Sequence, residues 1–208
     1  MKIPFLERTL VLIKPDAVKR GLIGEIIGRF ERAGLYIIAL KLIHPSLEYA
    51  RQHYPLTETQ LVQMGNKTLT TYAELNIDPV EKLGTSEPKK IGLMVHEWNA
   101  QFLASGPVVA CVIQGVHAIQ KVRAICGATM PKDAEPGTIR GDLSSASPAI
   151  ANMLKSAVYN LVHASDNKND PEEPEREISY WFRTSEIIDY LPADYAAMFK
   201  MEDSNESG

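Results

Sequence analysis

Cysteine is scarce in this chain of 208 residues, which contains only Cys111 and Cys126. The two form no Cys-x-x-Cys pair and have no metal-ligand spacing, which argues against a disulfide-stapled fold and a cysteine-based metal site. We expect both to be reduced residues that fill apolar packing positions.

Long hydrophobic runs are also missing. The longest strongly apolar stretch, residues 108–113, is far shorter than the roughly 20 residues of a membrane-spanning helix. The first residues, MKIPFLER, lack the apolar segment and the small-residue cleavage site of a secretory signal. We therefore expect no membrane partner and a cytoplasmic location.

An excess of positive charge is absent as well, because 22 Lys and Arg stand against 26 Asp and Glu, a formal net charge of -4. A protein held on nucleic acid by its overall charge would be basic, so we expect no nucleic-acid partner. The apolar share of 45% and the charged share of 23% are typical of a soluble globule. The length favours one domain with insertions over two domains.

Hydrophobic periodicity predicts strands that alternate with helices. The predicted strands are residues 8–13, 35–43, 108–113 and 178–182. Apolar residues at helical spacing predict helices over residues 23–30 and 118–125, and Ser46 is suited to cap a short helix that ends near residue 54.

Residues 55–101 form a predicted helical elaboration, with turn signals at Gly65-Asn66 and Asp78-Pro79. Its clearest helix is predicted by five apolar residues at helical spacing: Ile91, Met94, Val95, Trp98 and Phe102.

The C-terminal third of the chain is less regular. Residues 127–147 have no periodic apolar face and are predicted to be a long loop. A helix is predicted to begin at Ser147-Pro148, with five residues on its buried side: Ile150, Met153, Leu154, Ala157 and Val158. Residues 166–176 are predicted to be a charged surface stretch.

Histidines are the first candidates for chemistry. His44, His53, His96 and His117 have no paired ligand at metal spacing, and we expect no function for them. His163 follows a region rich in Gly and Ser and stands three residues after Asn160. From its surroundings alone, a polar loop histidine is a better interpretation than a catalytic one.

The loop before His163 is dense in groups that bind phosphate, in a chain that is otherwise acidic. These are Arg123, Thr129, Lys132, Thr138 and Arg140. An arginine offers a fork of donors that matches two phosphate oxygens, so two arginines suit a polyphosphate. Each arginine alone could equally be a solvated surface charge.

Six segments, in this order, closely resemble the nucleoside diphosphate kinase family. They are residues 7–16 (ERTLVLIKPD), 20–27 (RGLIGEII), 105–110 (SGPVVA), 127–131 (GATMP), 136–142 (PGTIRGD) and 160–166 (NLVHASD). The resemblance covers residues 7 to about 191. It implies a single domain over residues 1–208, with a helical insertion at about 55–101 and an extended loop and helix at about 143–159.

The resemblance implies an α+β fold, ferredoxin-like, in which a β-α-β-β-α-β core builds a four-stranded antiparallel sheet with flanking and inserted helices. It also implies the reaction. A γ-phosphoryl group moves from a nucleoside triphosphate, typically ATP, to a histidine and then to a nucleoside diphosphate, which maintains nucleotide pools. Such a relay gives ping-pong kinetics. The resemblance further implies Mg²⁺ on the nucleotide phosphates, no metal site on the protein, and a homo-oligomer, either hexamer or tetramer.

Residue roles follow by position from the same resemblance. His163 matches the phosphorylated histidine, Glu177 the glutamate that accepts its other ring N–H, and Ser165 the serine that supports that glutamate. The remaining matches bind nucleotide, with Lys14 also counted as catalytic: Lys14, Tyr54, Arg123, Thr129, Arg140 and Asn160. Arg123, Thr129 and Arg140 are implied to hold phosphates, Tyr54 to approach the transferred group, and Lys14 with Asn160 to reach the ribose 3′-hydroxyl and phosphate.

The chain departs from the family in two places. The Pro-Phe-Phe motif that stacks on the base is absent, Val95 and His96 lie near its position, and Trp98 or Tyr72 is a possible substitute. Val158 and Tyr159 replace a Gly-Arg pair, and Ala follows His163 where the family has Gly. These departures keep open an alternative, a nucleotide-binding regulator or scaffold of the same fold with weak turnover.

Overall fold

The computed structural model describes residues 3, 5–54, 57–168, 170–193 and 195. Its centre is a four-stranded sheet of β1 (Leu6–Ile13), β2 (Tyr36–Ile43), β3 (Val108–Val116) and β4 (Val162–Ala164). The strands lie in the order β2-β3-β1-β4, and every neighbouring pair is antiparallel. The predicted ferredoxin-like sheet is confirmed.

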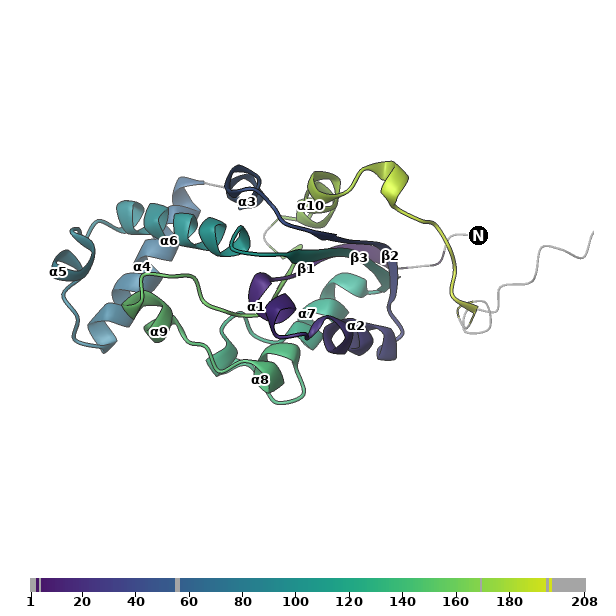
Figure 1. Cartoon of the computed structure of the whole chain (residues 1–208), viewed down its shortest axis with the longest axis horizontal. Coiled ribbons are helices and arrows are strands. Elements are labelled where there is room, and N and C mark those ends of the chain that lie inside the picture. Colours follow the sequence, from purple (N-terminus) through teal and green to yellow (C-terminus); the bar gives the residue numbers. More distant parts are fainter. Residues whose placement is uncertain (1–2, 4, 55–56, 169, 194, 196–208) are drawn as a thin grey trace, which may run out of the picture.

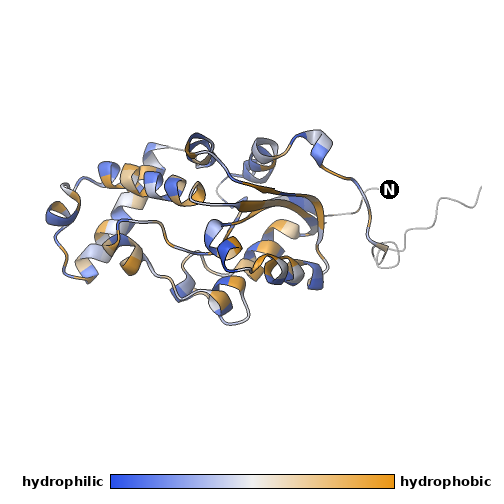
Figure 2. Ribbon diagram, viewed as in Figure 1, coloured by the Kyte–Doolittle hydropathy of each residue, from blue (hydrophilic) through white to orange (hydrophobic). Residues whose placement is uncertain are grey.

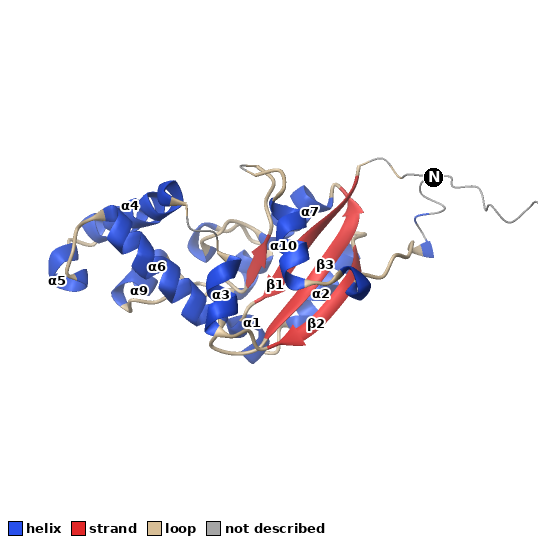
Figure 3. Cartoon of the chain, turned by 90° about the horizontal axis from the view of Figure 1, so that it is seen from above, coloured by secondary structure: helices blue, strands red, loops and turns tan. Residues whose placement is uncertain are grey.

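Both faces of this sheet are covered by helices (Figures 1 and 3). One face carries α2 (Ile23–Arg32) and α7 (Ala118–Cys126), and the other carries α3 (Leu47–His53) and α10 (Glu173–Trp181). Alternation along β1 explains this, because Leu10 and Leu12 join the core under α3 and α10 while Val11 and Ile13 join the core under α2 and α7. Figure 2 shows the strands as the most continuously hydrophobic part of the chain.

The fourth strand is not where the sequence analysis placed it. Residues 178–182 were predicted as a strand, but α10 runs through most of them, and β4 pairs with β1 instead. Taken alone, the apolar and aromatic residues at 178–182 are typical of a strand. Taken together with the charged residues before them, they continue a helical pattern. The buried side of α10 consists of Pro174, Glu177, Ile178 and Trp181, a helical spacing that begins within the stretch predicted as charged surface.

The predicted helical elaboration consists of α4 (Glu58–Glu74), α5 (Pro79–Leu83) and α6 (Pro88–Leu103). The helices α4 and α6 pack side by side and extend beyond the end of the sheet (Figures 1 and 3). The turn at Asp78-Pro79 is confirmed, since the Asp78 side chain caps α5. The turn at Gly65-Asn66 is wrong, because both residues lie inside α4.

Gly65 and Gly92 are needed for this close packing. A Cβ on Gly65 would lie 1.9 Å from the Pro88 carbonyl oxygen, and one on Gly92 would lie 2.0 Å from the Leu61 carbonyl oxygen. The apparent turn signal at Gly65 is therefore a site of close backbone approach between two helices.

Replacing Gly92 by alanine should destabilise the protein. The new methyl group pushes α6 away from α4, and overpacking of this kind costs about 1–3 kcal/mol, more than the roughly 1 kcal/mol that alanine gains in helix propensity. Urea unfolding measures the change. The matched control is Gly24→Ala in α2, where a Cβ meets nothing within 4 Å and the free energy of unfolding should rise. Equal stabilisation by both substitutions would contradict this packing.

The predicted loop at residues 127–147 contains two short helices, η1 (Pro131–Asp133) and α8 (Ile139–Leu143), so that prediction is only partly correct. Two further short elements are α1 (Pro15–Lys19), after β1, and η2 (Thr184–Glu186), after α10. Across the residues that the structure describes, no helix is long and apolar enough to cross a membrane.

The helix predicted from Ser147-Pro148 exists as α9 (Pro148–Met153), but its predicted buried side is mostly wrong, since of the five residues only Ala157 is buried. Ile150, Met153 and Leu154 are more than half exposed. The helix ends after six residues, near a positive φ of 51° at Lys155, so helical spacing does not continue to residue 158. It rests on α4 instead, where the Tyr72 hydroxyl donates a 2.8 Å hydrogen bond to the Asn152 carbonyl.

Candidate active site

His163 is held at the centre of the short edge strand β4. Pairing with β1 sets His163 opposite Leu12. Its neighbours Val162 and Ala164 are buried against the α2 and α7 side, so alternation turns the His163 side chain toward α10, where it is 19% exposed.

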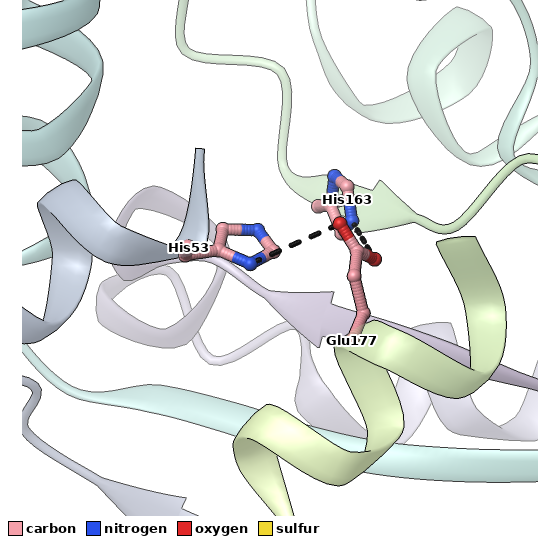
Figure 4. Close-up of side chains that lie close together, drawn as sticks. All are labelled: His53, His163 and Glu177. Atoms are coloured by element: carbon pink, nitrogen blue, oxygen red, sulfur yellow. Dashed lines mark hydrogen bonds and ion pairs between the residues drawn. The ribbon is translucent and has the colours of Figure 1, made fainter. Parts of the chain in front are cut away.

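Glu177 on α10 meets His163 from behind. His163 Nε2 lies 2.7 Å from Glu177 Oε2, and the Ser165 hydroxyl donates a 2.5 Å hydrogen bond to the same oxygen. Burial raises the pKa of Glu177, but its interactions with His163, His53 and the Ser165 hydroxyl outweigh this and bring the pKa to about 2. The carboxylate is therefore ionised at neutral pH, accepts the Nε2–H, and leaves the Nδ1 lone pair of His163 free. Figure 4 shows this second nitrogen turned away from Glu177.

His53, for which no function was predicted, lies against this pair. Its ring packs edge to face on His163, with centroids 4.7 Å apart, and its Nδ1 lies 3.9 Å from Glu177 Oε1. Trp181 Nε1–H donates a 3.2 Å hydrogen bond to the same Nδ1. Burial, with a contribution from His163, lowers the pKa of His53 to about 3, so the ring is neutral. In the sequence, the one indication that His53 belongs to the site was its position next to Tyr54, a predicted nucleotide-binding residue.

Lys14 lies just before α1 and Asn160 lies two residues before β4, and their side chains are in contact. Lys14 Nζ donates a 2.8 Å hydrogen bond to Asn160 Oδ1, and Asn160 Nδ2 donates to the Thr129 carbonyl. Burial first, and then the charge of Arg140, lower the pKa of Lys14 to about 8, against the opposing effect of Asp16. Its positive charge is therefore lost in mildly alkaline solution.

The family resemblance implies that Lys14 binds nucleotide, so this pKa predicts a pH dependence of nucleotide affinity. Lys14 is charged below about pH 8 and neutral above it, so binding of a nucleoside diphosphate should weaken about tenfold between pH 7 and pH 9. Calorimetric titration with ADP across this range measures it. Lys14→Arg keeps a charge at all these pH values, so a steep loss that persists in this variant would assign the dependence to another group.

The two arginines predicted to hold phosphate differ in their surroundings. The Arg123 side chain is 38% exposed, contacts Asp166 at 3.1 Å and donates to the Ala164 carbonyl. The Arg140 side chain is buried and donates to the carbonyl oxygens of Gly127 at 2.7 Å, Asn160 at 3.1 Å and Val162 at 2.7 Å. Arg123 is thus the more accessible cation, and Arg140 ties the loop before α8 to the chain around β4.

A cleft of about 720 Å³ joins these groups, within the size range of small-molecule sites. All six predicted nucleotide-binding residues and the candidate nucleophile line it: Lys14, Tyr54, Arg123, Thr129, Arg140, Asn160 and His163. The opposite wall comes from α4, α6 and α9, including Lys67, Val95 and Asn152. Ser165 and Glu177 lie behind His163, outside this lining.

The predicted substitutes for the stacking aromatic do not reach the cleft. Tyr72 is fully buried beneath α9, so it cannot stack on a base. Trp98 is not part of the cleft lining, and the buried His96 ring lies 3.3 Å from the Tyr54 carbonyl. Val95 does line the cleft, near the position expected for the missing motif.

Comparison with known proteins agrees with this geometry. A family model described as nucleoside diphosphate kinase matches residues 7–69 and 88–187. The model does not match residues 70–87, which lie inside the predicted helical insertion and include α5.

Several relatives are named nucleoside diphosphate kinase, and two of them show the extent of the similarity. The one from Pyrobaculum aerophilum is 47% identical over 184 residues, covering 88% of this chain and 99% of the relative. The one from Pyrococcus furiosus is 40% identical over 188 residues, covering 90% of each.

Solved structures lead to the same family. An NDP kinase from Pyrobaculum aerophilum superposes with a TM-score of 0.85 at 46% identity, covering 88% of this chain and all of that chain. A transition-state mimic of the Borrelia burgdorferi nucleoside-diphosphate kinase, with bound vanadate and ADP, has a TM-score of 0.71 at 36% identity, covering 93% and 96%. This chain therefore belongs to the nucleoside diphosphate kinase family of phosphotransferases.

Proposed function

We propose that phosphoryl transfer from a nucleoside triphosphate to a nucleoside diphosphate runs through Nδ1 of His163 in this chain. The observation that carries the proposal is the 2.7 Å contact between His163 Nε2 and the ionised Glu177, because it fixes the hydrogen on Nε2. The Nδ1 lone pair then forms a bond to the γ-phosphorus while the bond from that phosphorus to the bridging oxygen breaks. The nucleoside diphosphate leaves with the electron pair.

The second half-reaction reverses these bonds. A terminal β-phosphate oxygen of another nucleoside diphosphate attacks the phosphorus, and the N–P bond breaks to regenerate neutral imidazole. The phosphorylated ring carries more positive charge than the free ring, and Glu177 stabilises it through the Nε2–H. Because one cleft serves both nucleotides in turn, the kinetics are ping-pong.

Positioning and charge supply the rest of the catalysis. Lys14 and Arg123 bring positive charge to the cleft, and the hydroxyl groups of Thr129 and Tyr54 add neutral donors. Asn160 holds the Lys14 ammonium at 2.8 Å. Arg140 lines the cleft and also holds the loop that contains Thr129, through its hydrogen bond to the Gly127 carbonyl.

Mg²⁺ is proposed to enter as part of the nucleotide substrate. Mg²⁺ prefers oxygen ligands. In the described ranges the one close group of three His, Cys, Asp or Glu ligand atoms is His53, His163 and Glu177, and its two imidazoles do not suit this ion. The phosphate oxygens of the nucleotide are therefore its expected ligands.

A homo-oligomer, hexamer or tetramer, also belongs to the proposal. The edge strand β2 leaves Leu40 and Leu42 53% and 64% exposed. The N-terminal half of this edge is partly covered, since the Ile38 carbonyl accepts a 2.8 Å hydrogen bond from Ile188 N–H, but Leu40 and Leu42 lie beyond it. An edge strand with exposed leucines favours association with a second copy. Light scattering coupled to gel filtration gives the subunit number. A cytoplasmic location remains a prediction from the sequence.

Isotope exchange tests the proposed reaction. Labelled ADP should exchange into unlabelled ATP when Mg²⁺ is present and no other nucleotide is added, because the phosphoenzyme returns its phosphoryl group to ADP. A regulator with weak turnover would bind ADP tightly without exchange. Exchange that required a third nucleotide would exclude the ping-pong route.

A further inference from the structure

Two imidazoles and one carboxylate meet directly behind the cleft. His53 comes from α3, His163 from β4 and Glu177 from α10 (Figure 4). One ligand atom from each lies within 4.8 Å of the others. We propose that these three residues bind a divalent transition ion such as Zn²⁺, and that ion binding and phosphorylation of His163 exclude each other.

The donor set fits this class of ion. Two histidines and a glutamate with an open fourth position are a known zinc arrangement, and imidazole ligands favour Zn²⁺, Cu²⁺ or Ni²⁺ over Mg²⁺. Zinc–ligand bonds of about 2.0–2.2 Å at tetrahedral angles place ligand atoms roughly 3.3 Å apart. The two histidines face different oxygens of Glu177: His163 Nε2 lies 2.7 Å from Oε2 and His53 Nδ1 lies 3.9 Å from Oε1. These separations lie on either side of roughly 3.3 Å, and with one atom from each residue all three lie within 4.8 Å of one another.

His53 is the residue that phosphoryl transfer does not use. Its side chain is 1% exposed, its Nε2 has no hydrogen-bond partner, and its Nδ1 accepts only the 3.2 Å bond from Trp181. An ion at Nδ1 has to displace this one long hydrogen bond. Because the bond comes from an indole, its displacement changes the surroundings of Trp181, and tryptophan fluorescence reports the event.

The exclusion follows from the two nitrogens of one ring, and it rests on the proposed function of His163. Neutral imidazole has one lone pair and one N–H. An ion bound at Nε2 requires the hydrogen to sit on Nδ1, which removes the nucleophilic lone pair. A phosphoryl group on Nδ1 instead keeps the hydrogen on Nε2, bound to Glu177, and leaves no lone pair for the ion.

The test measures Zn²⁺ affinity by competition with a chromophoric chelator, with tryptophan fluorescence recorded in parallel. The wild-type protein should bind one Zn²⁺ per chain, and His53→Gln should bind it at least tenfold more weakly. His44→Gln is the matched control, because His44 is exposed and lies outside the cluster. Protein first phosphorylated with ATP and freed of nucleotide should bind no Zn²⁺ at concentrations that saturate the unmodified protein.

Each outcome has a separate meaning. Absence of binding to the wild type, or equal affinity in His53→Gln and His44→Gln, overturns the site. Equal affinity before and after phosphorylation overturns the exclusion alone. If no phosphoenzyme forms, the proposed function fails, and the comparison of the two variants still decides the metal site. The visible spectrum of Co²⁺ bound to the wild type gives a second measurement, and a six-coordinate spectrum would contradict a tetrahedral site.

Discussion

Replacing His163 by glutamine should lower the rate of phosphoryl transfer from ATP to GDP by about four orders of magnitude or more, as loss of a covalent nucleophile does in other enzymes. Glutamine keeps a polar group next to Glu177 but has no ring nitrogen that can form an N–P bond. The fold should persist, because the side chain it replaces faces the cleft and not the cores on either side of the sheet. A coupled assay for GTP measures the rate, and circular dichroism checks folding.

Glu177→Gln provides an intermediate comparison. It removes the charge that fixes the hydrogen on His163 Nε2 while leaving the nucleophile in place. Loss of such an orienting partner typically costs about 10–100-fold. The loss of transfer rate in Glu177→Gln should therefore be much smaller than the loss in His163→Gln. Undiminished transfer in His163→Gln would show that another group carries the phosphoryl unit.

The second large effect is expected for Arg140→Met. Arg140 donates to carbonyl oxygens from two separate segments, and its side chain is 4% exposed. Methionine fills similar space but leaves these buried carbonyls without donors, so the free energy of unfolding should fall by about 3 kcal/mol or more. Activity should fall as well, because the loop that contains Thr129 loses its anchor. Thermal unfolding and urea titration measure the loss of stability.

Arg123→Met is the matched control, because it removes the same charge from the same cleft. Arg123 is partly exposed, and its ion pair with Asp166 lies near the surface, where such pairs contribute about 0–1 kcal/mol. This variant should unfold almost like the wild type and show a raised KM for nucleotide. If both variants lost the same stability, the structural role assigned to Arg140 would be wrong.

Three of the four strands could be predicted from the sequence because each has a residue pattern that reflects its burial. The strands β1, β2 and β3 each contain an apolar run because helices cover most of both faces of the sheet, and such runs can be recognised without a structure. The strand β4 is too short, at three residues, to produce a run of its own. The aromatic end of α10 was taken for a strand in its place.

The candidate site was predicted in its composition and less well in its arrangement. Family motifs brought His163 and Glu177 forward, and the structure sets them 2.7 Å apart. Nothing in the sequence distinguishes a buried arginine bound to carbonyls from one free to bind phosphate, so Arg123 and Arg140 looked alike. His53 was missed because its neighbours in space, Trp181 and Glu177, are more than 120 residues away along the chain.

The chemical form of the phosphoenzyme tests the central claim most directly. Protein labelled by ATP can be hydrolysed in alkali, and chromatography then separates the two phosphohistidine isomers, while peptide mass spectrometry identifies the residue. The contact between Nε2 and Glu177 predicts that the label lies on His163 and is the Nδ1 isomer. A label on Nε2, or on any residue other than His163, would contradict the account.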